Sequence, residues 1–346
     1  MKVLHVSATF TAGVYEAIKQ YSANTPAVEH HLLVERRAAS DMPPAESTAF
    51  FSGKGPTSIW EIRRAVRSVS PNVVHVHSSW AGFWARLALA NSPLVYQPHG
   101  LASEGYGSTR SLRFIYSAVE KALAPKTEAF IALSDREHAV LSKIARGRTV
   151  HLIENTASLP EAQRDRWAPP RIPTFGMMGR IFPQKDPEFF RQFADAYNEL
   201  HPPANFVWIG DGDVRIRSEL EAAGIRVTGW LSADEVAREL SQLSIYVHTS
   251  LYEGYSLSIL DAALVGVPIL LRDVPSSAGI ELAMFTSVSE AVDLAARAVG
   301  SMDRLGKLHE SSAALTDGHT SAKQREQLMH IYEVASRIAP RRPAGG

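Results

Sequence analysis

The sequence contains no cysteine and no excess of charge: among its 346 residues, 36 lysines and arginines balance 36 aspartates and glutamates. The absence of cysteine excludes disulfides, thiolate metal sites and cysteine nucleophiles. The charge balance gives no indication of nucleic-acid binding, because proteins that bind a phosphate backbone usually carry a basic excess. No run approaches the roughly 20 apolar residues of a membrane-spanning helix, and the run after Met1 is too short for a signal peptide. We therefore expect a soluble cytoplasmic protein, with peripheral membrane contact left open.

What the chain does contain is a globular composition, with 45% hydrophobic and 21% charged residues. Its length predicts two domains of about 150 residues each. Short apolar runs, typical of strands covered on both faces, alternate with longer helical patterns, and this alternation predicts doubly wound parallel sheets. The predicted strands are Lys2–Val6, His31–Glu35, Val73–His77, Leu94–Gln97, Ala129–Leu133, Val150–Ile153, Thr174–Met178, Asn205–Ile209, Ile225–Val227, Ile245–His248 and Pro268–Leu271. The clearest predicted helices are Thr57–Val69, Pro187–Leu200, Ala233–Leu243 and Ser289–Val299.

The segment Leu159–Pro173 is the predicted linker between the two domains. It holds four prolines in a polar stretch before a new strand begins, and such stretches are typical of domain boundaries. A final predicted helix, Ser321–Ile338, places Leu328, Ile331 and Ala335 on one face. An amphipathic helix of this kind must pack against another part of the protein.

The first chemically informative motif follows the strand predicted at Thr174–Met178. Gly179 lets the backbone approach a ligand closely, and Arg180 and Lys185 supply two cations suited to phosphate oxygens. Because ligands bind at the carboxyl ends of strands in doubly wound domains, these residues indicate a phosphate site. The alternative is a solvated turn with two surface cations.

A second motif runs from Glu253 to Asp261, after the strand predicted at Ile245–His248. Gly254 and Ser256 at the predicted start of a helix leave backbone N–H groups that can receive phosphate. The carboxylate of Asp261 can accept hydrogen bonds from vicinal hydroxyls, and Glu253 can reach a sugar. Taken alone, Glu253 is also explained as an acid stabilised by the helix dipole.

Two further strand ends carry weaker signals. The sequence Gly210-Asp211-Gly212-Asp213 is explained equally by ligand contact and by a tight turn with an aspartate cap. The pair Gly229-Trp230 closes another strand, where Trp230 either lies against a base or belongs to the core.

The amino-terminal half offers His99, which follows the strand Leu94–Gln97 and can hydrogen-bond a sugar or exchange a proton near neutral pH. His75 and His77 share one face of a strand, but without a third ligand we interpret them as structural histidines rather than a metal site. Gly13 lies in a predicted loop between the first strand and first helix. That loop lacks the G-x-G-x-x-G fingerprint of a dinucleotide site.

Together these motifs resemble the retaining glycosyltransferases of family 4, which include many bacterial polysaccharide and glycolipid enzymes. The block Glu253 to Asp261 is similar to the family's E-x7-E motif, with aspartate as the second acid, and Gly13 is the only match to a loop usually richer in glycine. The resemblance extends over most of the chain. Its anchors are Val73–His77, His99-Gly100, Ile153–Asn155, Gly179-Arg180 with Lys185, Gly210–Gly212, and the Glu253–Asp261 block.

The resemblance implies a GT-B fold, in which two Rossmann-like domains face each other across a cleft. It implies that residues 1–160 form the acceptor domain, that residues 171–320 form the nucleotide-sugar donor domain, and that a helix at 321–340 crosses back to the first domain.

By position, the resemblance also implies roles for single residues. Arg180 and Lys185 would hold the donor diphosphate, Glu253 the transferred sugar and Asp261 the ribose, while His99 would contact the sugar from the other domain. The remaining donor-contacting positions are Gly13, Gly179, Gly210, Asp211, Gly229, Trp230, Gly254, Tyr255, Ser256 and Leu257.

The implied reaction moves a hexose-type unit from a UDP- or GDP-linked donor to a sugar, glycolipid or small-molecule acceptor, with retained configuration and no metal. Although Asp211 and Asp213 match an aspartate-x-aspartate metal motif, we interpret that stretch as a turn. Two alternatives remain: a non-catalytic nucleotide-sugar-binding subunit, which the shorter acid at Asp261 allows, and a nucleotide-sugar epimerase. Arg63, Arg64 and Arg67 either touch anionic lipid or form a solvated helix face.

Overall fold

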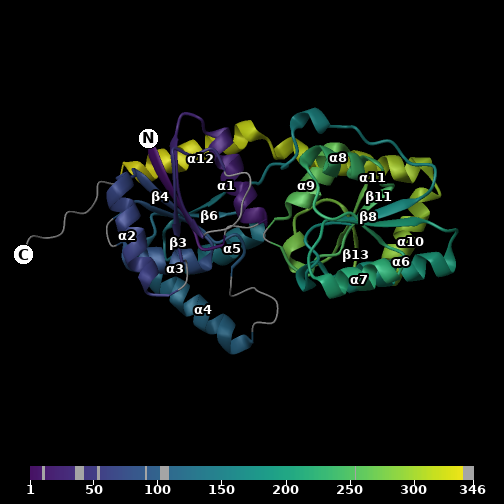
Figure 1. Ribbon diagram of the computed structural model, residues 1–346, viewed down its shortest axis with the longest axis horizontal. Coiled ribbons are helices and arrows are strands. Elements are labelled where there is room, and N and C mark those ends of the chain that lie inside the picture. The colour runs from purple at the N-terminus through teal and green to yellow at the C-terminus, as the bar shows by residue number, and fades with distance from the viewer. Residues whose placement is uncertain are drawn as a thin grey trace, which may run out of the picture. The chain divides into compact units, whose positions relative to one another are not determined.

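The computed structural model describes residues 1–9, 12–35, 43–52, 55–89, 92–101, 109–253 and 255–337. It divides into two compact units, the first formed by Met1–Asn155 with Thr320–Gly346 and the second by Thr156–His319 (Figure 1). Each unit is an α/β body built on its own parallel sheet.

The first unit contains a seven-stranded sheet in the order β3-β2-β1-β4-β5-β6-β7, and every pair of neighbouring strands is parallel. β3 was not predicted, because most of its residues are exposed and it lacks an apolar run. The strands are β1 (Lys2–Ser7), β2 (Glu29–Glu35), β3 (Ser47–Phe51), β4 (Val73–His77), β5 (Leu94–Gln97), β6 (Ala129–Ala132) and β7 (Thr149–Leu152).

Helices cover both faces of this sheet. α1 and α12 pack beside each other, with Tyr21 and Tyr332 in one apolar cluster, and α2 and α3 pack together elsewhere in the unit; Figure 1 shows the yellow α12 alongside α1. The helices are α1 (Ala12–Asn24), α2 (Thr57–Val69), α3 (Ser79–Ala88), α4 (Arg110–Leu123), the 3₁₀ turn η2 (Ala124–Lys126), α5 (Asp135–Ile144) and α12 (Ser321–Ser336). The last helix thus packs on the first unit, and Ile338 of its predicted range lies outside the described residues.

The second unit contains a six-stranded parallel sheet in the order β10-β9-β8-β11-β12-β13. Its strands are β8 (Thr174–Met178), β9 (Asn205–Ile209), β10 (Arg226–Val227), β11 (Ile245–His248), β12 (Ile269–Arg272) and β13 (Ala283–Phe285). Its helices are α6 (Pro187–Leu200), α7 (Val214–Ala222), α8 (Ala233–Ser241), α9 (Leu257–Val265), α10 (Val288–Val299) and α11 (Met302–Ala314). The 3₁₀ turns are η3 (Glu161–Gln163), η4 (Pro183–Lys185), η5 (Pro275–Ser277) and η6 (Leu315–Gly318).

Local chemistry sets several helix starts in this unit. Asp213 caps α7 by accepting from the N–H groups of Arg215 and Ile216, both at 3.0 Å, and Ser287 accepts from the N–H of Glu290 at the start of α10. Such caps satisfy N–H groups that have no partner within the helix. The adjacent apolar runs then become strands because both sheet faces are covered.

The predicted linker Leu159–Pro173 is part of the second unit, not a connection between units. The N–H of Asp165 donates to the carbonyl of Leu264 and that of Trp167 to Val265, each at 3.0 Å. The indole N–H of Trp167 also donates to the carbonyl of Leu243 at 2.7 Å. The units divide between Asn155 and Thr156, because these hydrogen bonds hold the proline-rich stretch against the second sheet's elements.

Candidate functional site

The order of strands in the second unit places β8 beside β11. The chain moves from β8 to β9 on one side and from β11 to β12 on the other, so this pair is the point where the winding direction changes. Ligands in doubly wound folds bind outside the carboxyl ends of such strands. The loop after β8 carries Arg180 and Lys185, and the loop after β11 carries Glu253.

Lys185 and Glu253 meet at this point. The ammonium of Lys185 lies 2.5 Å from the Oε1 of Glu253, and the two side chains are only 16% and 17% exposed. Gln184 joins the same two loops. Its side-chain amide donates to the backbone carbonyl of Tyr252 at 2.9 Å, and its backbone carbonyl accepts from the N–H of Leu251. A half-buried cation and carboxylate are therefore held together at the end of β8 and β11.

Asp186 fixes the turn that carries Lys185. It adopts a left-handed conformation with φ of 49° and caps α6 by accepting from the N–H of Phe189. Its other carboxylate oxygen accepts from Arg272 at 2.6 Å, and the Arg272 guanidinium also covers the ring of Phe189. Sequence analysis missed Arg272, since only the pairing of β12 with β11 brings it to this turn.

Arg180 has a different environment from Lys185. Its side chain is exposed, and its guanidinium lies 4.9 Å from the centre of the Phe182 ring. Within the described ranges no ion pair involves Arg180, so its guanidinium can meet an anion without first breaking one.

The turn at Gly210 approaches the end of β8 very closely. A side chain at Gly210 would meet the carbonyl oxygen of Gly179 at 2.3 Å, and the φ of Gly210 is +135°, which only glycine adopts readily. The indole of Trp208 donates to the same carbonyl at 2.9 Å. The backbones at the ends of β8 and β9 can therefore approach each other this closely only if position 210 has no side chain.

Asp211 and Asp213 lie in a turn and at a helix cap. Asp211 accepts from the N–H of Gly212 at 2.8 Å and pairs with Arg217 at 3.0 Å, while Asp213 caps α7. Both carboxylates thus bond donors of their own turn and helix.

Gly229 and Trp230 follow β10. Gly229 has a φ of +76° and forms an isolated bridge to Gly210. Trp230 is 69% exposed, so the core alternative is wrong and the indole face is available for contact.

The structure does not support a ribose contact for Asp261. This carboxylate is buried and accepts from the N–H and hydroxyl of Ser158, each at 2.6 Å, and from the N–H of Leu159 at 3.0 Å. Burial raises the pKa of Asp261 to about 6, and the Ser158 and Leu159 donors oppose that shift. Asp261 therefore anchors the segment after Asn155 to α9.

The start of α9 follows Glu253 closely in the chain. Leu257 is its first residue, Ser256 is its buried N-cap, and the Tyr255 hydroxyl lies 3.2 Å from His319. Gly254 lies outside the described residues. The first N–H groups of such a helix suit an anion.

Sequence analysis also missed His248, the last residue of β11. It is buried, burial lowers its pKa well below the usual value, and its Nε2 lies 4.0 Å from Glu253. In the part of the chain that the structure describes, this nitrogen has no hydrogen-bond partner. The signal in the sequence was a polar residue ending an apolar strand.

In the first unit, His99 occupies the turn after β5 with a left-handed φ of 54°. Gly100 donates its N–H to Glu137 at 2.9 Å, and the same carboxylate accepts from the N–H of Leu133. The Nε2 of His99 lies 2.8 Å from the Nδ1 of His77. Glu137 was missed, although its S-x-x-E spacing after Ser134 is a capping pattern.

Gly13 does not lie in a loop. It belongs to the first turn of α1, which begins at Ala12, and a side chain there would meet nothing within 4 Å. The predicted close-approach loop is therefore corrected to a helix start, and Thr11 of that loop lies outside the described residues.

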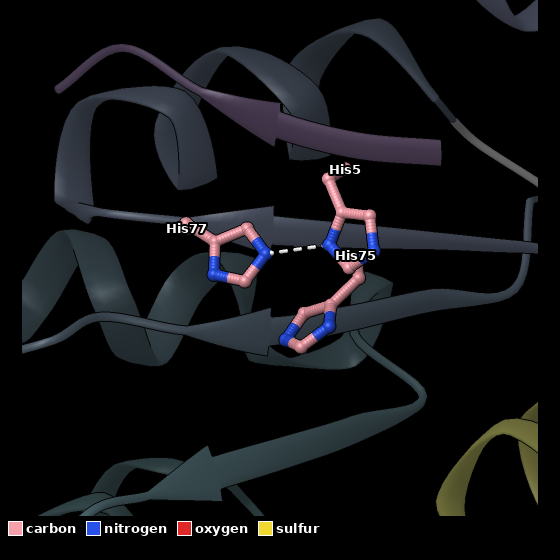
Figure 2. Close-up of side chains that lie close together, drawn as sticks. All are labelled: His5, His75 and His77. Atoms are coloured by element: carbon pink, nitrogen blue, oxygen red, sulfur yellow. Dashed lines mark hydrogen bonds between the residues drawn. The ribbon is translucent and has the colours of Figure 1, made fainter. Parts of the chain in front are cut away.

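His75 and His77 do gain a third neighbour. His5, His75 and His77 each offer a nitrogen within 4.8 Å of the others, and Figure 2 shows His5 and His77 joined by a hydrogen bond. That bond, at 3.0 Å, places one proton between Nδ1 of His5 and Nε2 of His77, whereas a metal needs an unprotonated nitrogen from each ligand. The three side chains are therefore close enough to ligate one metal ion, but a nitrogen of His5 and a nitrogen of His77 are already hydrogen-bonded to each other.

The described helices include none that is long and apolar enough to cross a membrane. Of the three arginines on α2, Arg63 donates to the carbonyl of Ala88 at the end of α3, and Arg64 lies over the ring of Trp60. These contacts engage Arg63 and Arg64 within their own unit, and the choice between lipid contact and a solvated helix face stays a prediction.

Two family models match this chain in succession. One, described as "Glycosyl transferase 4-like domain", matches residues 6–156, and the other, "Glycosyl transferases group 1", matches residues 172–301. Together they cover both sheets except for most of β1, which begins at Lys2.

Two curated relatives are glycosyltransferases by name. An Escherichia coli UDP-Gal:alpha-D-GlcNAc-diphosphoundecaprenol alpha-1,3-galactosyltransferase is 26% identical over 63% of this chain and 62% of its own length. A Mycobacterium tuberculosis GDP-mannose-dependent alpha-mannosyltransferase is 25% identical over 61% of this chain and 57% of its own length. The chain thus matches less than two thirds of the length of these two relatives.

Solved structures share the fold. Sucrose-phosphate synthase from Thermosynechococcus elongatus superposes with a TM-score of 0.78 at 16% identity, over 97% of this chain and 100% of that one. Anabaena Alr3699/HepE, solved in complex with UDP and glucose, gives 0.77 at 12% identity, over 96% and 99%. With two Rossmann-like parallel sheets and both family models matched, the chain belongs to the group 1, family 4 type of glycosyltransferases and has the GT-B fold.

Proposed function

We propose that the protein transfers a hexose-type sugar from a nucleoside-diphosphate sugar to an acceptor hydroxyl, with retained anomeric configuration, in glycoconjugate synthesis. The Lys185–Glu253 pair at the carboxyl ends of β8 and β11 is the observation that carries this proposal. It combines a cation for the leaving diphosphate with a carboxylate for the sugar at the position where doubly wound folds bind ligands.

The difficult step is departure of the nucleoside diphosphate. The bond from the anomeric carbon to the diphosphate oxygen breaks, the acceptor oxygen bonds that carbon on the same face, and the acceptor proton leaves with the diphosphate. Lys185, Arg180 and the first N–H groups of α9 would offset the charge that develops on the leaving group. Lysine has three donors, so Lys185 can contact both Glu253 and a phosphate oxygen.

The relatives support the donor class and leave the base open. The printed names of two relatives specify UDP-galactose and GDP-mannose, and HepE was solved with UDP. Exposed Trp230 and the bridge from Gly229 to Gly210 give a place where a base could lie against a ring and backbone. We propose a UDP- or GDP-linked donor on this basis.

The test begins with purified protein and a panel of UDP- and GDP-sugars. Donors that bind should raise the melting temperature, because a ligand bound only by the native state stabilises it. Donors that do so are then assayed for hydrolysis and for transfer, and proton NMR coupling at the new anomeric centre gives the configuration. Binding with neither hydrolysis nor transfer would instead indicate a non-catalytic nucleotide-sugar-binding subunit, and an inverted product would contradict retention.

We also propose peripheral contact with a membrane through α4. Leu112, Phe114 and Ile115 are exposed at its amino-terminal end, Phe114 by 76%, and Lys121 lies further along the helix. Arg113, between Leu112 and Phe114, is also exposed, and exposed apolar side chains beside a basic one suit the surface of an anionic bilayer. Replacement of Phe114 and Ile115 by serine should abolish co-sedimentation with phosphatidylglycerol vesicles; unchanged co-sedimentation would exclude this surface.

A further inference from the structure

Four histidine rings form a continuous hydrogen-bonded chain through the first unit. His99 Nε2 lies 2.8 Å from His77 Nδ1, His77 Nε2 lies 3.0 Å from His5 Nδ1, and His5 Nε2 lies 3.0 Å from His30 Nδ1. The chain ends where His30 Nε2 lies 2.9 Å from the hydroxyl oxygen of Thr25. Figure 2 shows its central contact, between His5 and His77.

The strand order explains how these rings come together. His30, His5 and His77 lie on β2, β1 and β4, which are neighbours in the sheet. The register pairs His30 with Val3 and His5 with His75, so the side chains lie on one face. His99 adds the last ring from the turn after β5. The chain therefore runs from β2, next to the edge strand β3, across β1 and β4 to the predicted sugar-contacting residue.

The far end of the chain fixes the direction of its hydrogen bonds. The Thr25 hydroxyl donates its single hydrogen to the carbonyl of Tyr21 at 2.7 Å. Toward His30, the hydroxyl oxygen can then act only as an acceptor. The carbonyl of Thr25, which lies 3.3 Å from the same His30 Nε2, is also an acceptor. His30 must therefore carry a hydrogen on Nε2.

The direction then passes from ring to ring. A neutral imidazole has one N–H and one acceptor nitrogen, so His30 Nδ1 accepts and His5 must donate from Nε2. By the same step His77 donates from Nε2 to His5, and His99 donates from Nε2 to His77. Reversal of any one ring would set two lone pairs or two N–H groups against each other at a buried contact, so the chain is fixed as a unit.

The environment keeps these rings neutral. Burial lowers the pKa of His5 and His77 well below the ordinary value and also lowers the pKa of His30 and His99. The neighbouring imidazoles also disfavour a positive charge on His5 and His77, so each ring of the chain carries a single N–H.

We propose that Thr25, His30, His5 and His77 are positioning residues that hold His99 as the neutral Nε2–H tautomer, leaving its Nδ1 as a hydrogen-bond acceptor for a hydroxyl of the sugar substrate. This inference rests on the proposed function and on the sugar contact that the family resemblance implies for His99. The ring is fixed by His77 and the backbone by the Gly100–Glu137 bond. A sugar hydroxyl must then donate to His99, so the site selects against a donor sugar whose hydroxyl at that place is methylated.

The tautomer is measured directly by long-range proton–nitrogen NMR of protein labelled with ¹⁵N in histidine, with signals assigned by single substitutions. At pH 7 we expect His99, His77, His5 and His30 all as neutral Nε2–H tautomers. A His99 that carries its hydrogen on Nδ1, or that is an imidazolium, overturns the proposal. This readout needs no activity, so it remains decisive even if glycosyl transfer is not found.

The matched variants are His5→Leu and His75→Leu. His75 is equally buried in the same cluster, but it contacts the Tyr332 hydroxyl and is not a member of the chain. We expect His5→Leu to give a mixed tautomer at His99 and to lower kcat about tenfold, the effect of about one lost hydrogen bond, with nucleoside-diphosphate affinity unchanged. We expect His75→Leu to change neither the tautomer nor kcat.

A purely structural role for the chain predicts that both variants lower the melting temperature and that neither alters His99. If His5→Leu leaves the His99 tautomer or kcat unchanged, or if His75→Leu alters them equally, the positioning role is wrong. Should His5→Leu fail to fold, His30→Gln serves in its place, because it removes the Nδ1 acceptor and keeps a donor near Thr25.

Discussion

Lys185 and Glu253 neutralise each other in a half-buried position. Arg180, five positions before Lys185, has a different environment: its side chain is exposed and its guanidinium lies over the ring of Phe182. A diphosphate that approaches this place would meet one cation that a carboxylate already holds and one that is exposed. The two cations are therefore expected to contribute differently.

We predict that Lys185→Ala lowers kcat by roughly 10²-fold or more, because the loss of a preorganised charge partner for the transition state costs several kcal/mol. The measurement is initial-rate kinetics at saturating donor. Arg215→Ala is the matched control, since Arg215 is an exposed cation of the same unit that pairs with Glu219 on the helix surface. Unchanged turnover in Lys185→Ala would remove the phosphate assignment.

Asp261 illustrates the opposite case, a residue whose motif position suggests a ligand and whose contacts are internal. Its hydrogen bonds to Ser158 and Leu159 use both carboxylate oxygens. The position in the motif therefore indicated a functional acid, and the packing of the segment after Asn155 gives it a structural role.

Asp261 should make stability depend on pH. Burial raises its pKa from 3.8 to about 6, so between these values the folded protein holds a proton that the unfolded chain has released. The contribution of Asp261 to stability is therefore largest below pH 4 and falls as pH rises to 6, by about 3 kcal/mol when measured against Asp261→Asn. Urea unfolding of both proteins from pH 4 to 7 measures this difference; a difference that does not change with pH would mean that the carboxylate titrates normally.

The apolar face of helix α12 packs against segments far away in the sequence, β1 and α1. Leu328, Ile331, Tyr332 and Ala335 are buried in a cluster with Val3. Asn24 of α1 donates to Gln324 at 2.7 Å. The carboxyl-terminal helix is therefore part of the first unit's core.

We predict that Ile331→Ala lowers the free energy of unfolding by about 3 kcal/mol, through lost apolar burial and the cavity left behind. Val334→Ala, on the exposed side of the same helix, should change it by less than about 0.5 kcal/mol. Both are measured by urea denaturation of the full chain. Equal effects would show that α12 does not dock through the face that contains Ile331.

For the whole molecule, the organisation is two parallel sheets with related strand orders, each with its winding change at one pair of strands. In the second unit this pair brings Lys185 to Glu253, and in the first it brings His5 to His77. The same topology thus produces a charged pair in one unit and a neutral histidine chain in the other.

We predict that transfer activity survives treatment with EDTA. The carboxylates of Asp211 and Asp213, which match a metal motif, bond donors of their own turn and helix, and cations with helix N–H groups can offset the diphosphate charge. Activity is compared before and after chelation and gel filtration. Complete loss that magnesium or manganese restores would contradict a metal-independent mechanism, and loss restored only by zinc or cobalt would point to the His5, His75 and His77 cluster.

The sequence by itself determined the local structure and the family. β4, β5, β8, β9 and β11 agree with the predicted bounds, because buried parallel strands are continuous apolar runs that need no distant information to recognise. The edge strand β3 and the short β13 could not be predicted, since an exposed or three-residue strand has no such run. The motif residues Lys185 and Glu253 were also recognised from residue type and spacing.

Only the tertiary structure decided which of these residues meet. Asp261 bonds Ser158 across more than a hundred positions, Arg272 reaches Asp186, and His30, His5, His77 and His99 join into one chain. Each of these contacts depends on strand order and register, which place side chains from separate segments within hydrogen-bond distance. A pattern along the sequence specifies which face a side chain takes, but the identity of its neighbour is set by the packing of distant segments, so these contacts became visible only in the folded protein.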